Sequence, residues 1–410
     1  MKYIDVSDNL YKITETYPET IDFFVKKGFA QMQQPQMRKT FGNSITLEMA
    51  LKLKQIEVKS FVEALEDLIE FTRNNQDTTL VERVFDPQAE VTLQGVLPCP
   101  VRMPLLEGWE QWLKENEATL GYSLSYKLQA ASMGLSWLID DLKNADKPDC
   151  FSDLFISAGF ELFFDKDLMG KFKSQGVFED LTGMHEYNED FNHAGISLKD
   201  PKGQYAMLGL VPAIFLVNEE ELKGKPMPKT WGDLLTEDYW GKVSLPIGDF
   251  DLFNAILLNI YKGYGEAGIQ ALGKSLFRGM HPSEMVKSHY HVEKPVVTIM
   301  PYFFTKMVQA NSPLKPVWPE DGAIISPIFM LCKKEKKDQL APIVSFFASK
   351  AVGEILAHQG RFPSVHPEVD NQGAKGKNYQ WLGWDFIEQN DIGDLIQKTQ
   401  ALFDQASGKK

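Results

Sequence analysis

Apolar side chains in the first seventy residues recur three or four positions apart, as on one face of a helix. TYPETIDFFVKKGF, residues 16–29, has this spacing, and the segments 43–56 and 60–71 repeat it. The pattern predicts three short amphipathic helices in an all-α domain over residues 1–72. Because about seventy residues give only a marginal core, we expect this domain to dock on the rest of the chain or to self-associate.

The pattern changes after a polar stretch, residues 73–89, that contains Pro87 and is typical of a linker. VTLQGVLP (91–98) and YSLSYKLQA (122–130) then predict strands, and helical spacing follows each of them. Strands that alternate with helices indicate βαβ units and a mostly parallel sheet.

Two strand-to-helix loops follow these strands. Residues 99–103 precede Pro104, which has the place of a first helical position. Residues 131–134 precede the second helix, with Ser132 as its predicted N-cap. Ligands collect outside the carboxyl ends of parallel strands, so we expect both loops to face one crevice.

Two longer apolar runs, YAMLGLVPAIFLV (205–217) and GAIISPIFMLC (322–332), are typical of strands buried on both faces. If both cross between two lobes, residues 90–210 and 325–410 form the first lobe and residues 211–324 form the second. Closure about such a hinge is the expected motion.

The composition fits a globular protein of two or three domains, with 410 residues, 43% hydrophobic and 24% charged. A net charge of −13 disfavours nucleic acid and anionic membranes as partners, although a local basic pocket stays open. We expect no integral membrane segment and, because no signal peptide is written, a cytoplasmic location. The three cysteines form no C-x-x-C pair, which disfavours a disulfide framework, a zinc ribbon or an iron–sulfur site.

Four segments beyond the linker follow one another in a characteristic order. They are DLFISAGFELFFDKDL (153–168), YAMLGLVPAIFLVNEEEL (205–222), PKTWGDLLTEDYWGKVSLP (228–246) and the stretch 318–363 that begins WPEDGAIISPIFMLC. Together they resemble type 2 periplasmic-type solute-binding proteins, in particular the iron(III) and small-anion branch that serves ABC importers. The resemblance implies an α/β, two-lobed periplasmic-binding-protein-like fold behind a small all-α domain. It also implies a non-enzymatic role, an extracytoplasmic location and a small anion or a metal such as iron as the ligand.

YPETIDFFVKKGF and TLEMALKLKQI in the N-terminal domain resemble a small helical domain of unknown function that is associated with hybrid-cluster proteins and redox disulfides. Relatives of that domain carry a cysteine pair between these segments, whereas this chain has AQMQQPQMRKTFGNS there. The redox role is therefore not carried over, and a helical module that binds a protein partner remains.

Cys99 and Arg102 are the first candidates for ligand contact. A Cys99 thiolate would need a base or a helix N-terminus beside it; the alternative is a small buried residue in a proline-constrained loop. Arg102 could clamp a carboxylate or phosphate in bidentate fashion, and its alternative is a surface salt bridge.

Further candidates lie at the ends of other predicted strands. Backbone N–H groups near Ser132 could bind an anion at a helix start, whereas ordinary capping and turn chemistry would explain the same residues. Tyr302 follows a strand that ends at Pro301, where it would line a cleft or pack between lobes. The full set of ligand-binding candidates at these strand ends is Ser132, Met133, Gly134, Ser157, Asp249, Asp251 and Tyr302.

Three of the seven histidines cluster in MHPSEMVKSHYHVEKP: His281, His289 and His291. A His-x-His pair on an extended segment points both rings to one face and would suit a zinc, copper or iron site if a third ligand arrived. The alternative is a solvated loop. Tyr290 and Tyr302 are close by in the sequence, and phenolates are ligands in the iron(III) relatives, but the adjacent tyrosine pair typical of those relatives is missing. Iron therefore stays open as a ligand.

Three functions remain in competition. The first is a ligand-binding protein of ABC-transporter type with no catalytic residues and an added interaction domain. The second is an intracellular metal-dependent or thiol-dependent enzyme, or a metal chaperone, in anaerobic metabolism. The third is a scaffold whose cleft is vestigial.

Overall fold

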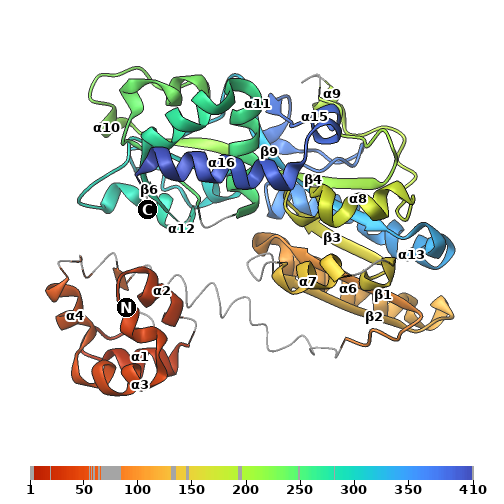
Figure 1. Cartoon of the computed structure of the whole chain (residues 1–410), viewed down its shortest axis with the longest axis horizontal. Coiled ribbons are helices and arrows are strands. Elements are labelled where there is room, and N and C mark those ends of the chain that lie inside the picture. The colour runs from red at the N-terminus through yellow and green to blue at the C-terminus, as the bar shows by residue number, and fades with distance from the viewer. Residues whose placement is uncertain are drawn as a thin grey trace. The chain divides into compact units, whose positions relative to one another are not determined.

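A computed structural model of the chain describes residues 4–18, 20–54, 56, 58, 61–62, 65, 85–130, 135–144, 147–192, 196–247, 250–280 and 282–408 (Figure 1). The chain divides into two compact units. The small unit comprises residues 1–82 and 290–292, and the large unit comprises residues 83–289 and 293–410.

The small unit is helical, as predicted. Its longer helices are α1 (Leu10–Thr16), α2 (Thr20–Lys26) and α4 (Leu47–Leu53), with α3 (Pro35–Met37) and short 3-10 and π turns between them. Its core is aromatic and aliphatic and includes Leu10, Ile13, Phe24, Phe29, Met32, Leu47, Leu51, Phe61 and Leu65.

The first predicted helix, over 16–28, is shorter in the structure. Tyr17 has φ −133° and ψ 73°, and α2 starts only at Thr20. Pro18 explains the break, because a proline disfavours the helical conformation in the residue before it. Most of the predicted third helix, 60–71, lies outside the described residues.

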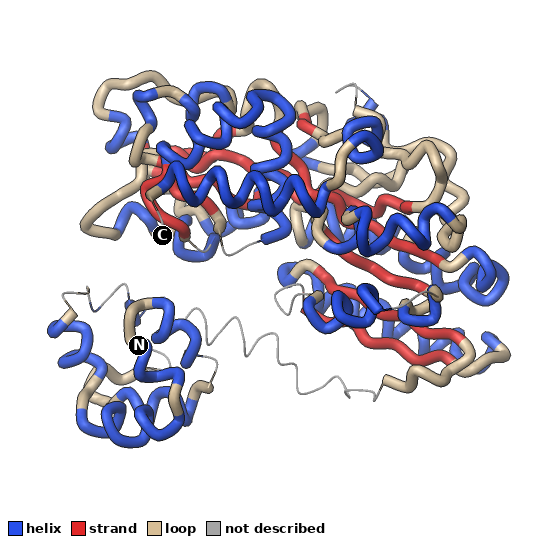
Figure 2. Tube along the Cα trace, in the orientation of Figure 1, coloured by secondary structure: helices blue, strands red, loops and turns tan. Residues whose placement is uncertain are grey.

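The large unit is built on one sheet in the order β2-β1-β3-β9-β4-β7-β5-β6, with β10 paired to β9 and β8 to β4. The strands are β1 (Val91–Leu97), β2 (Leu124–Ala130), β3 (Leu154–Ala158), β4 (Tyr205–Asn218), β5 (Val243–Leu245), β6 (Leu276–Gly279), β7 (Val297–Pro301), β8 (Leu314–Val317), β9 (Ala323–Cys332) and β10 (Tyr379–Gln380). Figure 2 shows these strands as a layer through the unit with helices on both sides.

The sheet is mixed rather than mostly parallel. Strands β1, β2 and β3 are parallel to one another, and so are β5, β6 and β7. Between these two sets, β4 and β9 run antiparallel to each other and to their outer neighbours. We call the half around β1–β3 the first lobe and the half around β5–β7 the second lobe.

Strands β4 and β9 join the lobes. Over Tyr205–Ala213, β4 pairs with β9, and over Ala213–Val217 it pairs with β7 of the second lobe. The last five residues of β9 pair with β3 of the first lobe. Both strands are buried along almost their whole length. This confirms the prediction that the two apolar runs are the crossover strands, whereas the exact lobe boundaries stay a prediction.

The middle of these hinge strands contains two prolines. Pro327 of β9 pairs with Leu210, and Pro212 of β4 pairs with Ile325. Proline has no backbone N–H to donate to a sheet. The register also shifts between Met207 and Gly209, so the β4–β9 pairing is irregular at the point where the lobes meet.

Helices cover the sheet on both faces. The first lobe carries α6 (Cys99–Leu120), α7 (Ser136–Asn144), α8 (Lys166–Ser174), α9 (Glu189–Asn192), α13 (Lys337–Phe347), α14 (Lys350–Glu354), the π-helix η11 (Ile355–Gln359) and α15 (Trp384–Gln389). The second lobe carries α10 (Glu219–Leu222), α11 (Phe250–Ser275), α12 (Pro282–Met285) and the 3-10 helix η9 (Tyr302–Met307). The last helix, α16 (Ile392–Ser407), lies along α11 and also contacts α8 (Figure 1), so the C-terminal segment touches both lobes.

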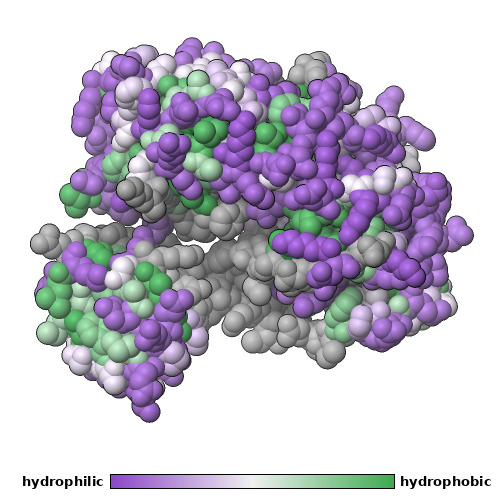
Figure 3. All heavy atoms as spheres, in the orientation of Figure 1, coloured by the Kyte–Doolittle hydropathy of each residue, from purple (hydrophilic) through white to green (hydrophobic). Residues whose placement is uncertain are grey.

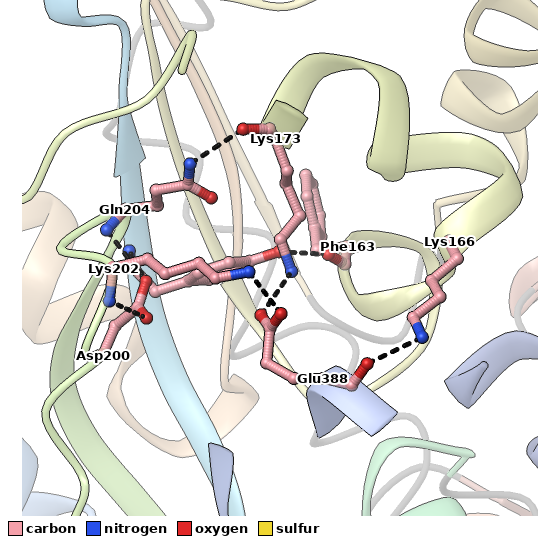
Figure 4. A network of polar contacts seen from close by, with 8 residues as sticks. Phe163, Lys166, Lys173, Asp200, Lys202, Gln204 and Glu388 are labelled. Atoms are coloured by element: carbon pink, nitrogen blue, oxygen red, sulfur yellow. Dashed lines mark hydrogen bonds and ion pairs between the residues drawn. The ribbon is translucent and has the colours of Figure 1, made fainter. Parts of the chain in front are cut away.

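A polar network fastens the C-terminal helices to the start of β4 (Figure 4). Glu388 of α15 forms an ion pair with Lys202, its other carboxylate oxygen lies 3.9 Å from the Lys173 ammonium, and its backbone carbonyl accepts a hydrogen bond of 2.8 Å from Lys166. Burial lowers the pKa of Lys173. One residue, Glu388, therefore interacts with three lysines at the start of a hinge strand, two through its carboxylate and one through its backbone carbonyl.

Within the described part of the chain, no single helix combines the length and the apolar character needed to cross a membrane. One bent pair, Lys334–Phe347 with Lys350–Gln359, meets that test by length and composition alone.

Candidate functional site

The carboxyl ends of the parallel strands in each lobe lie at the middle of the hinge strands. Strands β3 and β4 both run antiparallel to β9, and β7 runs antiparallel to β4. Ala158, the last residue of β3, pairs with Ile328, and Pro301, the last residue of β7, pairs with Ala213. Because ligands of such sheets bind outside the carboxyl ends of the strands, the segments after β3 and β7 form the candidate site.

The segment after β3 contacts the start of α11 in the second lobe. The Asn254 side chain donates a hydrogen bond of 3.0 Å to the Glu161 carboxylate and accepts one of 2.7 Å from Gln400 of α16. Gly159 has a φ of +89°, and a Cβ added to it would lie 2.6 Å from a carboxylate oxygen of Asp251. The two lobes therefore touch here without room for one more methyl group.

The segment after β7 contacts the first lobe at η11. Lys306 donates hydrogen bonds of 2.9 and 2.6 Å to the last two backbone carbonyls of η11. The Arg361 guanidinium lies 5.4 Å from the centre of the Tyr302 ring and donates a hydrogen bond to the Thr305 hydroxyl. Burial, and then the neighbouring Arg361, lower the pKa of Lys306. Two cations from opposite lobes thus lie near each other, Arg361 over the Tyr302 ring and Lys306 over the Phe303 ring.

The first turn of α6 packs against the same segment. A Cβ on Gly360, next to Arg361, would lie 2.5 Å from a methyl carbon of Val101. Arg102 follows in this turn and is half-buried. The positive end of the α6 dipole therefore lies near the two cations, which favours negative charge there.

The loop predicted for residues 99–103 is part of that helix. Helix α6 starts at Cys99 with Pro98 as its N-cap, so Pro104 lies inside the helix and not at its start. Pro100 has the early position instead, where the missing N–H removes no helical hydrogen bond. The Cys99 side chain is not described.

The other predicted site residues have different positions. Ser157 is fully buried in β3, opposite Phe329, and its hydroxyl lies 3.4 Å from the next carbonyl oxygen. Asp251 lies in the first turn of α11 and Tyr302 begins η9. Four predicted contacts lie outside the described residues: Ser132, Met133, Gly134 and Asp249.

The histidine cluster has a different backbone from the one predicted. His289 lies in a 3-10 helix (Ser288–Tyr290), so the extended His-x-His arrangement is absent. His289 is half-buried, and burial lowers its pKa. His291 lies outside the large unit, and His281 lies outside the described residues. In the part of the chain that the structure describes, no three His, Cys, Asp or Glu side chains gather where they could hold a metal ion.

Sequence reasoning missed Lys306 and Arg361, which lie on separate segments and meet through the hinge pairing. A lysine five residues after the predicted strand end was the available signal for Lys306. Arg361 gave no signal before the fold was known. Two pockets, of about 240 and 10 Å³, are lined by other side chains, and neither lining includes Tyr302, Lys306 or Arg361.

Comparison with known proteins agrees with this architecture. The fold resembles the apo ferric ion-binding protein A of Pasteurella haemolytica (TM-score 0.52, 14% identity, 78% of this chain and 98% of that one). It also resembles a Trichodesmium protein in complex with iron and citrate (TM-score 0.53, 12% identity, 78% and 99%) and the periplasmic binding protein P5PA (0.53, 12%, 76% and 99%). No curated protein matches the chain in sequence.

Two families match the sequence itself. Residues 4–62 match a domain of unknown function, and residues 149–390 match a family described as bacterial extracellular solute-binding protein. The second match covers more than half of the chain, and its description assigns a binding role rather than catalysis. The chain belongs to the bacterial extracellular solute-binding proteins.

Proposed function

We propose that this solute-binding protein takes a small anionic solute between its lobes, beside Arg361 and Lys306. Among the described residues, neither side chain has a carboxylate partner: Lys306 donates to backbone carbonyls and Arg361 to a hydroxyl. Two neighbouring cations with only neutral partners are favourable for an anion. This observation carries the proposal.

Closure fits the same site. Lys306 comes from the second lobe and Arg361 from the first, so an anion bound by both would hold the lobes together. Arg102 at the start of α6 could add a third cationic contact. A hydrogen bond between charged groups contributes about 1.5–3 kcal/mol, so loss of one cation should weaken binding at least tenfold.

A thermal-shift screen of the full chain with phosphate, sulfate, citrate and glutamate tests the proposal. A ligand at a hundredfold its Kd adds about 2.7 kcal/mol to the free energy of unfolding. Arg361→Gln and Lys306→Gln should each remove most of the shift. Lys315→Gln, an exposed lysine of β8, is the matched control and should keep it. If every anion that stabilises the parent stabilises both site variants equally, the proposal is refuted.

Iron is the second candidate solute, because proteins of this fold include ones named for ferric ion. Among the described residues, no three His, Cys, Asp or Glu side chains gather as ligands for a bare metal ion. We therefore propose that iron, if it is carried, enters as a complex with an anionic chelator. Ferric citrate that binds no better than citrate, in paired titrations, would remove this candidate.

For the small unit we propose a role in protein association. Met49 and Leu53 lie one turn apart on α4 and are 57% and 76% exposed, and Figure 3 shows hydrophobic side chains on the visible face of this unit. Sedimentation of the full chain should show self-association that Met49→Ser with Leu53→Ser reduces without a change in the unfolding midpoint. A parent protein that stays monomeric at high concentration would contradict self-association.

A further inference from the structure

A pocket of about 240 Å³ lies at the edge of the second lobe away from the hinge. Three segments line it: residues 221–225 after β4, residues 238–242 before β5 and residues 294–296 before β7. The amino ends of β5 and β7 therefore face this pocket, whereas their carboxyl ends face the hinge. The two places cannot share one ligand.

Lysines dominate the lining. Lys223 forms an ion pair of 3.0 Å with Glu221, and Lys225 forms one of 2.6 Å with Asp238. Two further lysines, Lys242 and Lys294, have no ion pair with a carboxylate among the described residues. The pocket thus has an excess of two positive charges in a chain whose net charge is −13.

Two of these ammonium groups are crowded together. Lys225 and Lys242 both donate hydrogen bonds to the backbone carbonyl of Asp238, at 3.1 and 2.6 Å. The contact with Lys225, together with burial, lowers the pKa of Lys242. Like charges at one oxygen repel each other, and an anion between them would remove that repulsion.

The backbone around the pocket is strained at one lysine. Lys223 has a φ of +50°, a left-handed conformation that costs a residue with a side chain roughly 1–2 kcal/mol. This turn places Lys223 and Lys225 on the rim. Strain of this kind is often retained at binding sites.

The floor of the pocket is apolar. Leu222, Tyr239 and Val296 are each less than a tenth exposed. A bound group would lose part of its water there, which strengthens its attraction to the lysines. The volume equals that of several water molecules at about 30 Å³ each, enough for a phosphate-based or carboxylate-based group and too small for a nucleotide.

We propose that this lysine pocket, lined by Lys223, Lys225, Lys242 and Lys294, is a second ligand site for a small oxyanion of two or more negative charges. It is independent of the solute site at the hinge. Phosphoryl and polycarboxylate compounds share the required chemistry, and pyrophosphate and citrate are the probes that distinguish them.

Calorimetric titration of the full chain at fixed ionic strength tests the proposal. We expect Lys242→Gln with Lys294→Gln to weaken binding of pyrophosphate or citrate at least tenfold. Lys229→Gln with Lys315→Gln removes the same charge from exposed positions of the second lobe and should change the Kd less than twofold. Arg361→Gln should leave this binding intact, which separates the pocket from the hinge site.

Lysine acetylation read by mass spectrometry gives a second measurement that needs no variant. Pyrophosphate should protect Lys242 and Lys294 from acetic anhydride at least threefold and should leave Lys315 unprotected. Equal protection of all three lysines, or equal loss of binding in both double variants, would overturn the proposal. If the Lys242→Gln, Lys294→Gln double variant unfolds, the single variant Lys294→Gln is used for the same titration. Among the described residues, the Lys294 ammonium group forms no hydrogen bond or ion pair whose loss would unfold the protein.

Discussion

Replacement of Gly159 by alanine should force the two lobes apart. Gly159 directly follows β3 and faces Asp251 of α11. A Cβ at Gly159 would lie 2.6 Å from a carboxylate oxygen of Asp251 and 3.0 Å from its Cβ. Ordinary contact begins at 3.4 Å. Either the carboxylate or the whole start of α11 has to withdraw by several tenths of an ångström.

Two separate effects contribute to the outcome. Alanine at a φ of +89° costs roughly 1–2 kcal/mol in every folded conformation. The steric clash, in contrast, raises the free energy only of conformations in which the lobes touch at this point. The first effect lowers stability, and the second shifts the lobes toward an open arrangement.

Gly203→Ala is the matched control, because Gly203 also has a positive φ, +61°, with nothing within 4 Å of an added Cβ. In urea titrations both variants should lose about 1–2 kcal/mol of unfolding free energy. In small-angle scattering, only Gly159→Ala should show a larger radius of gyration, and Asp251→Ala in the same chain should reverse most of the increase. If the two glycine variants have the same radius as the parent, the lobes are not held at this contact and the reasoning is wrong.

Three further predictions concern buried groups. Lys333 and Asp153 form an ion pair of 3.3 Å, and both side chains are less than a tenth exposed. In urea titrations, Asp153→Asn should therefore lower the free energy of unfolding by about 3–5 kcal/mol, and Lys333→Met in the same chain should recover most of this loss. A loss below about 1 kcal/mol would contradict the prediction. The Ser244 hydroxyl is buried without a hydrogen-bond partner among the described residues, so Ser244→Ala should leave stability unchanged or raise it by up to about 1 kcal/mol, and a clear loss would show an undetected partner. Burial raises the pKa of the fully buried Cys332 thiol, so iodoacetamide should modify the half-buried Cys150 much faster in the native protein, whereas equal rates would mean that β9 opens readily.

The hinge strands could be predicted from sequence because burial on both faces leaves a continuous apolar run. The antiparallel pairing in the centre of the sheet could not be predicted, because an apolar run shows that a strand is buried and does not show in which direction it crosses between the lobes. The start of α6 was misplaced for a local reason. Pro100 and Pro104 both suit an early helical position, and only the packed structure selects the first of them.

Site residues could be predicted from sequence where a polar or aromatic side chain comes soon after a predicted strand. Asp251 and Tyr302 were identified in this way, and the structure places both at the junction of the lobes, although their role as ligands stays a prediction. Arg361 lies more than fifty residues after Tyr302 in sequence, and the two side chains meet only because β4 and β9 pair. Long-range pairing of this kind leaves no local pattern to read.

The two prolines in the middle of the hinge strands affect how easily the lobes open. The residue pairs that contain Pro212 and Pro327 flank a single pair, Val211 with Ser326. Neither proline has a backbone N–H that could donate a hydrogen bond to the neighbouring strand. A swing of one lobe therefore bends a stretch with few backbone bonds to break. We therefore expect the side-chain contacts between the lobes, such as the hydrogen bond from Asn254 to Glu161, to contribute much of the resistance to opening.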